Sequence, residues 1–303
     1  MLSAQRTDED EDIVESNPSR SVRIWSLLSA IKSNGGALIG AIIVGAFVII
    51  AIIQYIGQLF KIQVTPYNPL KQDVGPPLAA PSAKYLMGTD QLGRDVFSRV
   101  LWAFPNDLRV SVIVIGFSLI VGALIGSYAA FSGGLLDEAL MRVTDIFFAI
   151  PALVLAMAIG LALGPGISNM TIALMIIWWP PYARLARGEA LKISHQNYIE
   201  AAKLSGAGKS KIIMGHALPN ISLTLVVYAS LDIGTVIITY AGLSYLGLGV
   251  KPPYPDWGEM VSSYQDFMLS SPWLPLFPGL IIALGVIGFS MLGDGLRETL
   301  QSV

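Results

Sequence analysis

The chain has 303 residues, of which 53% are hydrophobic and only 13% are charged. A soluble domain carries about 25% charged residues, so much of this surface is expected to face something other than water. The formal net charge of −2 excludes a basic surface for nucleic acid, and the absence of cysteine excludes disulfides, thiolate metal sites and thiol catalysis. With only two histidines, no metal site is predicted.

The first 36 residues divide into two predicted parts. Residues 1–19 are acidic and polar, do not resemble a cleaved signal peptide, and predict a disordered cytosolic tail. Within residues 20–36, apolar side chains recur at helical spacing beside Arg20, Arg23 and Lys32. This pattern predicts an amphipathic helix at the membrane interface, and the alternative is the polar start of the first span.

Six hydrophobic runs follow, at 37–56, 110–131, 146–163, 167–182, 221–248 and 275–292. A helix needs about 20 residues to cross a hydrocarbon core of ~30 Å. We therefore predict an all-α membrane protein, with a bundle of six transmembrane helices in a domain at 37–303. The fourth run is marginal because a Trp-Trp-Pro-Pro sequence crowds its end. Two G-x-x-x-G motifs, at 36–40 and 122–126, allow close helix approach.

The basic residues of the loops predict the orientation. With the N-terminus in the cytosol, twelve Lys and Arg residues fall in cytosolic segments and seven in external ones. An excess of Lys and Arg marks cytosolic loops. Both termini and a loop at 183–220 are therefore predicted to be cytosolic, and a loop at 57–109 to be external.

The loop at 183–220 has a helical pattern of its own. Alanines, leucines and charged residues recur at helical spacing up to His195. A second helix is predicted from Asn197 through Glu200, Ala201 and Ala202, whose small side chains allow it to lie close to the bundle or in the groove of a partner.

A turn and a further helical stretch complete this loop. Gly206 suits a tight turn because glycine tolerates positive φ, and Pro219 is predicted to end the helical stretch at 209–216. Residues 206–210 look like the end of a phosphate-binding loop. The glycine that such a loop needs is replaced by Lys203, so no nucleotide site is predicted on this chain.

Asp232 is the acidic residue in the middle of a predicted span. An ionisable group at that depth is costly and usually faces the bundle interior or a water-filled path. A substrate with a free ammonium group, or a basic residue of a partner chain, would be its natural counterpart.

Several motifs together resemble one family. Glu200-Ala201-Ala202, Gly206 and Leu218-Pro219 have the spacing of the coupling loop in permease subunits of ABC importers. The segments MGTDQLGRDVFSR at 87–99, LSYLGLG at 243–249 and GDGLR at 293–297 resemble the C-type permeases of dipeptide, oligopeptide and nickel importers. The resemblance extends over residues 70–298.

The resemblance implies a non-catalytic inner-membrane subunit. Its implied partners are a second homologous permease subunit in a heterodimer, two ATP-binding subunits, and an external substrate-binding protein. ATP and magnesium would bind to the partner ATPases, and this chain would carry no cofactor. The residues implied to dock on the ATPases and to couple ATP hydrolysis to transport are Glu200, Ala201, Ala202, Gly206, Leu218 and Pro219.

The outer residues leave alternatives open. Asp90, Arg94 and Asp95 form either an external lip near the binding protein or a structural element, in which residues 88–90 cap a helix and Asp95 pairs with Arg99 four residues later. Trp257 either faces an outer gate or anchors the chain at the lipid interface.

Asp232 and Tyr240 are the candidates for the translocation path. The subgroup usually has an acidic residue four positions before Ser244, where this chain has Tyr240. A peptide is the favoured solute, with an oligosaccharide or a nickel or other metal chelate as alternatives. An intramembrane enzyme would need facing catalytic groups that the spans lack, and a channel would not need a coupling loop.

Overall fold

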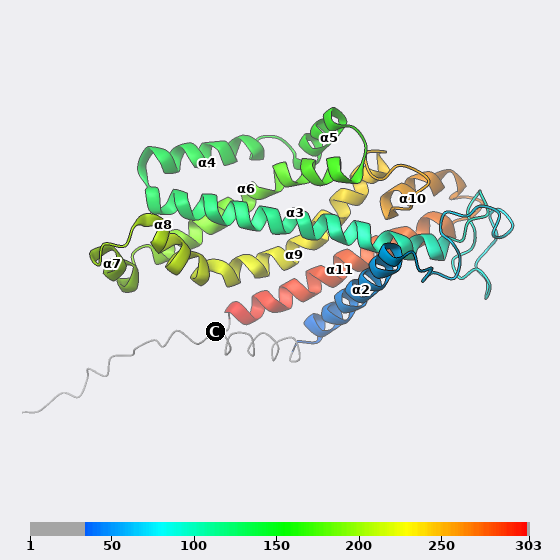
Figure 1. The fold of residues 1–303 in the computed structure, drawn as a ribbon, viewed down its shortest axis with the longest axis horizontal. Coiled ribbons are helices and arrows are strands. Elements are labelled where there is room, and N and C mark those ends of the chain that lie inside the picture. Colours follow the sequence, from blue (N-terminus) through cyan, green and yellow to red (C-terminus); the bar gives the residue numbers. More distant parts are fainter. Residues whose placement is uncertain (1–33, 302–303) are drawn as a thin grey trace, which may run out of the picture.

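A computed structural model describes residues 34–301, which form an elongated bundle of helices (Figure 1). The predicted tail at 1–19 lies outside the described residues, as does the predicted interfacial helix at 20–36 except for its last three positions. The elements are α2 Gly35–Phe60, α3 Val96–Ser132, α4 Gly134–Phe148, α5 Ala152–Leu163, α6 Ile167–Ile193, α7 Asn197–Leu204, α8 Lys209–Ile212, η1 Ile213–Ala217, α9 Leu218–Tyr245, α10 Trp257–Tyr264, η2 Gln265–Phe267 and α11 Trp273–Gln301. Of these, η1 is a π-helical turn and η2 is a 3₁₀ turn.

Four of the six hydrophobic runs of the sequence, at 37–56, 110–131, 221–248 and 275–292, correspond to long apolar helices. Within residues 34–301, four helical segments are long and apolar enough to cross a membrane: α2, α3, the continuous run from α8 to α9, and α11. The bent pair α4–α5 adds a fifth if it counts as one broken span. Helix α6 has 27 residues and so reaches about 40 Å, but polar residues occupy its second half. The all-helical membrane class is confirmed.

Helix α3 begins earlier than predicted. It starts at Val96 rather than at 110, so the loop predicted at 57–109 is confined to 61–95. The side chain of Asp95 caps the helix by accepting the Ser98 N–H. Arg99 and Asp107 lie inside the protein, with 2% and 1% of their surface exposed. Helix α3 can therefore include these two charged residues without exposing them to lipid.

The prediction of a single third span at 146–163 is wrong. Helices α4 and α5 meet at an angle of 85°. Pro151 lies at the break, where it lacks an N–H group and disfavours helical geometry in the residue before it. Helix α5 has 12 residues, about 18 Å, which is too short to cross a bilayer alone.

Prolines do not interrupt α6 and α9 as predicted. Helix α6 continues through Pro180 and Pro181 to Ile193, so the loop predicted to begin at 183 begins near 194. Pro219 does not end a helix, because α8, η1 and α9 form one run. It lies in the first turn of α9, where a missing N–H costs least, and the wide π turn η1 precedes it.

Glycines bring the helices into close contact. A Cβ on Gly126 would lie 2.1 Å from the Ala183 carbonyl oxygen, and one on Gly122 would lie 2.4 Å from the Tyr182 Cβ. These contacts hold α3 against α6 without intervening side chains. Gly40 does the same for α2 and α11, since its Cβ would lie 2.4 Å from the Leu292 nitrogen. Both G-x-x-x-G motifs therefore mark the close helix approaches that they predict.

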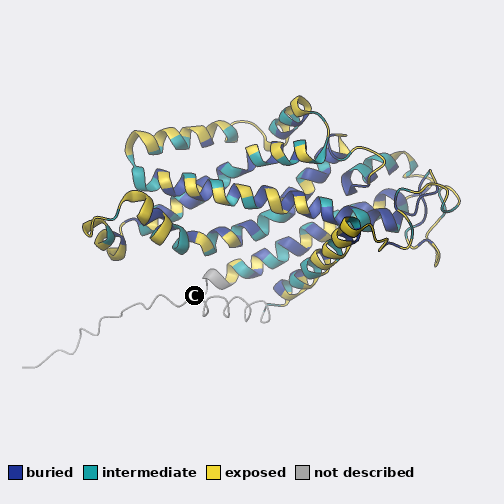
Figure 2. Cartoon of the chain, viewed as in Figure 1, coloured by how far each residue is buried: buried dark blue, intermediate teal, exposed yellow. Residues whose placement is uncertain are grey.

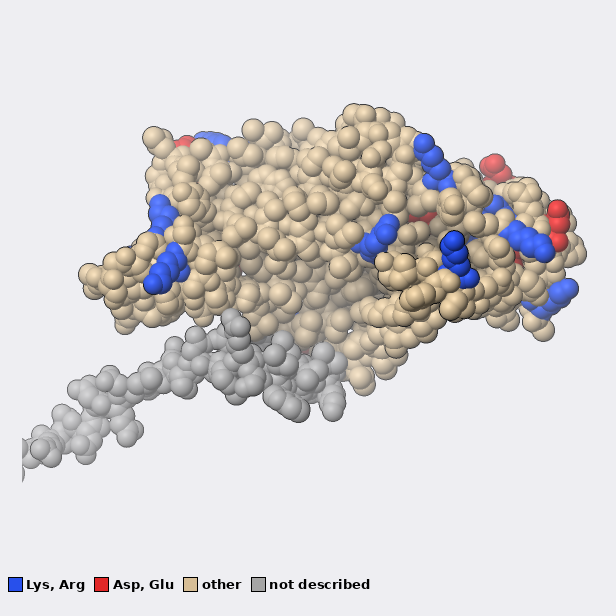
Figure 3. Space-filling model, viewed as in Figure 1, with Lys and Arg blue, Asp and Glu red and all other residues tan. Residues whose placement is uncertain are grey.

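The surface of the bundle has the pattern of a membrane protein. Exposed apolar side chains cover the outward faces of α2, α3 and α5 (Figure 2). Lys, Arg, Asp and Glu gather towards two ends of the molecule, one at α7–α8 and the other at the 61–95 loop, with a mostly uncharged band between them (Figure 3). The candidate coupling loop and the candidate lip thus lie at opposite ends.

Candidate functional site

Helix α7 projects from one end of the bundle (Figure 1). Of its eight residues only Ile199 is buried, and it anchors the helix. Glu200 and Ala201 are exposed, Ala202 is half-buried, and Leu204 has 89% of its surface exposed. The Glu200 side chain has no hydrogen bond or ion pair with the described residues. A helix this short is marginal by itself in water, so its exposed face suits a partner groove.

Gly206 ends α7 in a Schellman motif, as the predicted turn requires. Its φ is +79°, in the left-handed region that favours glycine. The Gly206 N–H donates to the Lys203 carbonyl, and the Ala207 N–H donates to the Ala202 carbonyl, each at 3.0 Å. These two bonds satisfy carbonyls at the helix end and fix the chain direction towards α8.

The loop that carries α7 joins helix α6 to the run of helix that ends in α9. Lys203 Nζ donates to the Ser194 carbonyl at the end of α6, at 3.2 Å. On the other side, the half-buried Leu218 and Pro219 form the first turn of α9. Arg187 of α6 forms two hydrogen bonds of 2.6 Å to Asp137, which tie α4 to the same end. Helix α7 is therefore tied to the end of α6 by a hydrogen bond and is connected to α9 through the run of α8 and η1.

A polar stripe runs along α9. Thr224, Tyr228, Asp232, Thr235 and Thr239 fall within about 80° of the helix circumference at about 100° per residue. All five are half-buried or exposed in the chain. Polar side chains along a membrane helix face the bundle interior, a partner or a water-filled path rather than lipid. The stripe places Asp232 on a polar face, as its prediction requires.

Asp232 lies against aromatic residues of α6. Its Oδ2 accepts a 2.6 Å hydrogen bond from the Trp178 Nε1 and a 3.2 Å bond from the Tyr182 hydroxyl. The Tyr182 ring packs edge-on against Tyr228, with the ring centroids 5.2 Å apart. We call Asp232, Trp178, Tyr182 and Tyr228 the aromatic cage. Sequence reasoning found Asp232 but not the α6 residues, because only the folded chain brings the two helices together.

A cavity of about 650 Å³ extends from the aromatic cage to the α7 end of the bundle. Tyr228 and Leu231 line it near the cage, and Glu189, Lys192 and Arg297 line it near the charged end. Residues of α6, α9 and α11 together form its wall. The aromatic cage and this cavity are the strongest candidates for a solute path within the described chain.

Tyr240 does not line this cavity. It is fully buried, and its hydroxyl faces the Asp256 carboxylate and Asp107. Asp256 also accepts a 2.5 Å hydrogen bond from the Ser244 hydroxyl. Sequence reasoning missed Asp107, because it lies outside the hydrophobic run that predicted the second span. Access of a solute to Tyr240 would require α3, α9 and α10 to separate.

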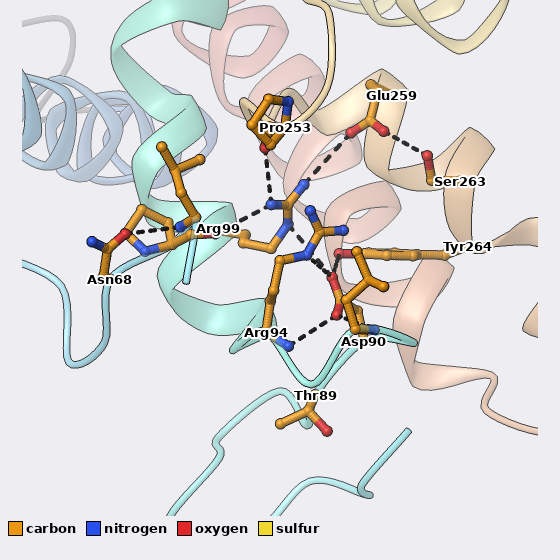
Figure 4. A network of polar contacts seen from close by, with 12 residues as sticks. Asn68, Thr89, Asp90, Arg94, Arg99, Pro253, Glu259, Ser263 and Tyr264 are labelled. Carbon is orange, nitrogen blue, oxygen red and sulfur yellow. Dashed lines mark hydrogen bonds and ion pairs between the residues drawn. The ribbon is translucent and has the colours of Figure 1, made fainter. Parts of the chain in front are cut away.

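The candidate lip residues form a buried junction rather than an exposed edge (Figure 4). The Asp90 Oδ1 accepts the Leu92 and Arg94 N–H groups at 2.9 Å. Its Oδ2 accepts the Arg94 Nε at 2.6 Å and the Tyr264 hydroxyl at 3.3 Å. Asp90 and Asp95 have 0% and 1% of their surface exposed and Arg94 has 6%. Their placement favours the structural alternative.

Arg99 lies at the centre of this junction and corrects two predictions. It does not pair with Asp95, whose carboxylate caps α3 instead. Its guanidinium lies 3.9 Å from Asp90 and 3.8 Å from Glu259, and it donates to the Pro69 and Pro253 carbonyls at 3.2 Å. The cap predicted at 88–90 is likewise supplied by Asp95. Arg99 thus joins the 61–95 loop to α3 and α10.

Trp257 is not a lipid anchor. Its indole has 0% of its surface exposed and packs edge-on against Phe104, with the ring centroids 4.8 Å apart. Its Nε1 donates to the Val100 carbonyl at 3.2 Å. The interface prediction is wrong because α10 folds back onto α3. Trp257 also lies too deep to be touched by an external partner in this conformation.

Burial determines the acidity of the carboxyl groups around α10. It raises the pKa of Asp256 above its ordinary value, although the hydrogen bond from the Ser244 hydroxyl opposes the shift. Burial also raises the pKa of Glu259, against the opposing effects of the Ser263 hydroxyl and Arg99. Burial likewise raises the pKa of Asp95 at the start of α3. The carboxyl groups of Asp256, Glu259 and Asp95 therefore stay protonated to a higher pH than exposed carboxyl groups do.

Comparisons with known proteins agree with this architecture. Residues 122–302, more than half of the chain, match the family described as binding-protein-dependent transport system inner membrane component. The chain is 38% identical over 271 residues to a dipeptide transport system permease protein of Alkalihalophilus pseudofirmus, covering 89% of this chain and 87% of the relative.

Two further relatives extend the comparison. A probable D,D-dipeptide transport system permease protein of Escherichia coli K12 is 38% identical, with 84% of this chain and 85% of the relative covered. A glutathione transport system permease protein of Pectobacterium atrosepticum is 39% identical, with 73% of each covered.

A chain of the MetNI methionine ABC transporter in an inward-facing conformation has the same fold. It matches with a TM-score of 0.55 and 17% identity, covering 68% of this chain and 97% of that chain. The family match, the similarity to these relatives and the apolar helices agree. The chain belongs to the family of binding-protein-dependent transport system inner membrane components, as a multi-pass permease subunit.

Proposed function

We propose that this permease subunit moves a peptide-like solute inward, driven by partner ATPases that dock on α7. The observation that carries the proposal is the exposed face of α7, where the unpaired Glu200 and Ala201 lie beside Leu204, which is 89% exposed. An apolar side chain this exposed at a charged end of the molecule is expected to be covered by a soluble partner.

The partners follow from the family and the geometry. Two ATP-binding subunits would hold ATP and magnesium, a second homologous permease would complete the path, and a substrate-binding protein would deliver the solute at the opposite end. This arrangement puts α7 and both termini in the cytosol and the 61–95 loop outside. The permease itself would carry no catalytic residue.

A small peptide is the solute that the relatives favour. Their names specify a dipeptide, a D,D-dipeptide and glutathione, all of which are short peptides or peptide derivatives. Oligosaccharides and metal chelates, nickel included, remain alternative solutes to be excluded by experiment.

The test is affinity purification of the tagged chain from native membranes, with identification of the proteins that accompany it. Two ATPases, a second permease and a substrate-binding protein are the expected result, and mass spectrometry of ligands released from the binding protein would identify the solute. A chain that purifies alone or as a homo-oligomer, without any ATPase, would overturn the proposal.

A further inference from the structure

The Asp232 carboxylate has no basic partner among the residues that the structure describes. The donors to its Oδ2 are a neutral indole and a neutral hydroxyl. No Lys, Arg or His of the described residues forms an ion pair with it. Its Oδ1 receives no hydrogen bond from them and is not enclosed. A carboxylate in the middle of a membrane helix is costly unless a cation approaches it.

The side chains around this carboxylate also favour a cation. Trp178 and Tyr182 direct their N–H and O–H groups at the carboxylate, and Tyr228 lines the adjacent cavity, where its aromatic ring can attract an ammonium or guanidinium group. The two hydrogen bonds fix the carboxylate in position, so a ligand would not have to order it. A carboxylate beside aromatic side chains suits an organic cation and disfavours an anion.

The cage lies on the route that a solute would take. Along the polar stripe of α9, the other members carry neutral hydroxyls: Thr224, Tyr228, Thr235 and Thr239. The cavity that begins at Tyr228 and Leu231 leads from the cage to Lys192 and Arg297. A positively charged group moving along the stripe therefore meets an attractive carboxylate at Asp232, and near the charged end it meets Arg297 and the ion pair between Lys192 and Glu189.

We propose that Asp232, within the aromatic cage, binds the protonated amino group of the transported solute. The membrane domain then selects solutes with a free ammonium group, independently of the selection made by the binding protein. This inference rests on the proposed function, because it assigns a recognition element to the same path.

The test uses the complete transporter in proteoliposomes with its binding protein. The probes are a chymotryptic casein digest and the same digest after N-acetylation, with ATP-dependent accumulation measured by mass spectrometry. Asp232→Asn keeps the size of the side chain and removes its charge, and Asp232→Glu retains the charge. Asp266→Asn, an exposed carboxylate outside the long helices, is the matched control.

Loss of a charge-assisted contact is expected to lower uptake of the free-amine peptides about 10-fold or more in Asp232→Asn. Acetylated peptides that enter should be unaffected, Asp232→Glu should recover part of the preference, and the control should match the wild type. Unchanged uptake of free-amine peptides in Asp232→Asn would overturn the inference.

Two other results separate the remaining explanations. Equal loss of both peptide sets, with loss of the second permease from the purified complex, would show that Asp232 pairs with a basic residue of a partner, and would overturn the inference. If the wild-type transporter accumulates no peptide while its ATPases remain bound and active, the peptide substrate is wrong and the permease role stands.

Discussion

Arg99 has an unusual position for a charged residue at the edge of a membrane helix, because its side chain is almost wholly enclosed. Asp90, Glu259 and two proline carbonyls surround it, and they belong to three separate segments of the chain. The charge is therefore a structural tie between the 61–95 loop and α10. This explains why a loop of irregular backbone remains ordered at this end of the bundle.

Arg99→Met should destabilise the outer junction strongly. Removing one partner of a buried ion pair leaves the others unpaired, at a cost of about 3–5 kcal/mol. We expect a clear fall in the thermal unfolding temperature of the purified transporter. Arg142→Met, which breaks an exposed pair with Glu138, is the control and should change little. Equal unfolding temperatures for both variants would contradict the role of Arg99.

Asp256 should make the stability of the transporter depend on pH. Burial raises its pKa in the folded state, so its favourable contribution is complete below the ordinary carboxyl range and is lost as the pH rises through the raised value. The unfolding temperature should therefore rise as the pH is lowered through the raised pKa of Asp256 towards the ordinary carboxyl range. Asp256→Asn preserves a cap for α10 and should flatten the profile, whereas Asp266→Asn should not. An identical slope in all three proteins would refute this assignment.

At the scale of elements, the turn after α7 has a testable geometry. Gly206→Ala places a side chain at φ +79°, which costs about 1–2 kcal/mol. Gly208→Ala lies two residues on, at an ordinary φ of −64°, with nothing near its Cβ. ATP-dependent uptake should fall several-fold in the first variant only, without loss of the protein from the membrane. Equal uptake by both variants would mean that the shape of this turn does not matter for coupling.

Local patterns predicted some elements well and others poorly. Helix α7 and the turn at Gly206 follow from short-range signals, namely small helix-forming residues and a glycine. The start of α3 and the length of α6 do not, because Arg99, Asp107 and Arg187 count against a span until the fold shows that Arg99 and Asp107 are buried and that Arg187 pairs with Asp137. Pro151 and Pro219 show the same limit. Pro151 lies at the break between α4 and α5, whereas Pro219 lies within the continuous run from α8 to α9.

At the scale of the whole molecule, the orientation can be measured directly because the chain has no cysteine. Ser205→Cys lies at the exposed end of α7, and Tyr254→Cys lies in an exposed loop at the opposite end. In intact cells, a membrane-impermeant maleimide should label only the second variant, and in inverted vesicles only the first. The reverse pattern would invert the proposed topology.

The bundle of membrane helices and the two ends of the molecule could be predicted from hydrophobic runs and loop charges, but the break between α4 and α5 could not. The candidate site could be predicted only in part. Asp232 is conspicuous as a lone charge within a span, but Trp178 and Tyr182 lie about 50 residues away in sequence and resemble ordinary membrane aromatics. Tyr240 was expected on the path and lies instead against Asp107 and Asp256, which no local pattern connects.

The attachment of α7 to two continuous helices has a mechanical consequence. Trp178 lies about 22 Å along α6 from Ile193, and Asp232 lies about 21 Å along α9 from Leu218. The hydrogen bond between Trp178 and Asp232 therefore joins α6 to α9 about 20 Å from the end of the bundle that carries α7. A relative tilt of about 3° would stretch the 2.6 Å bond between Trp178 and Asp232 beyond hydrogen-bonding range. A small rotation of α6 against α9 is therefore enough to open this side of the aromatic cage, without unwinding either helix.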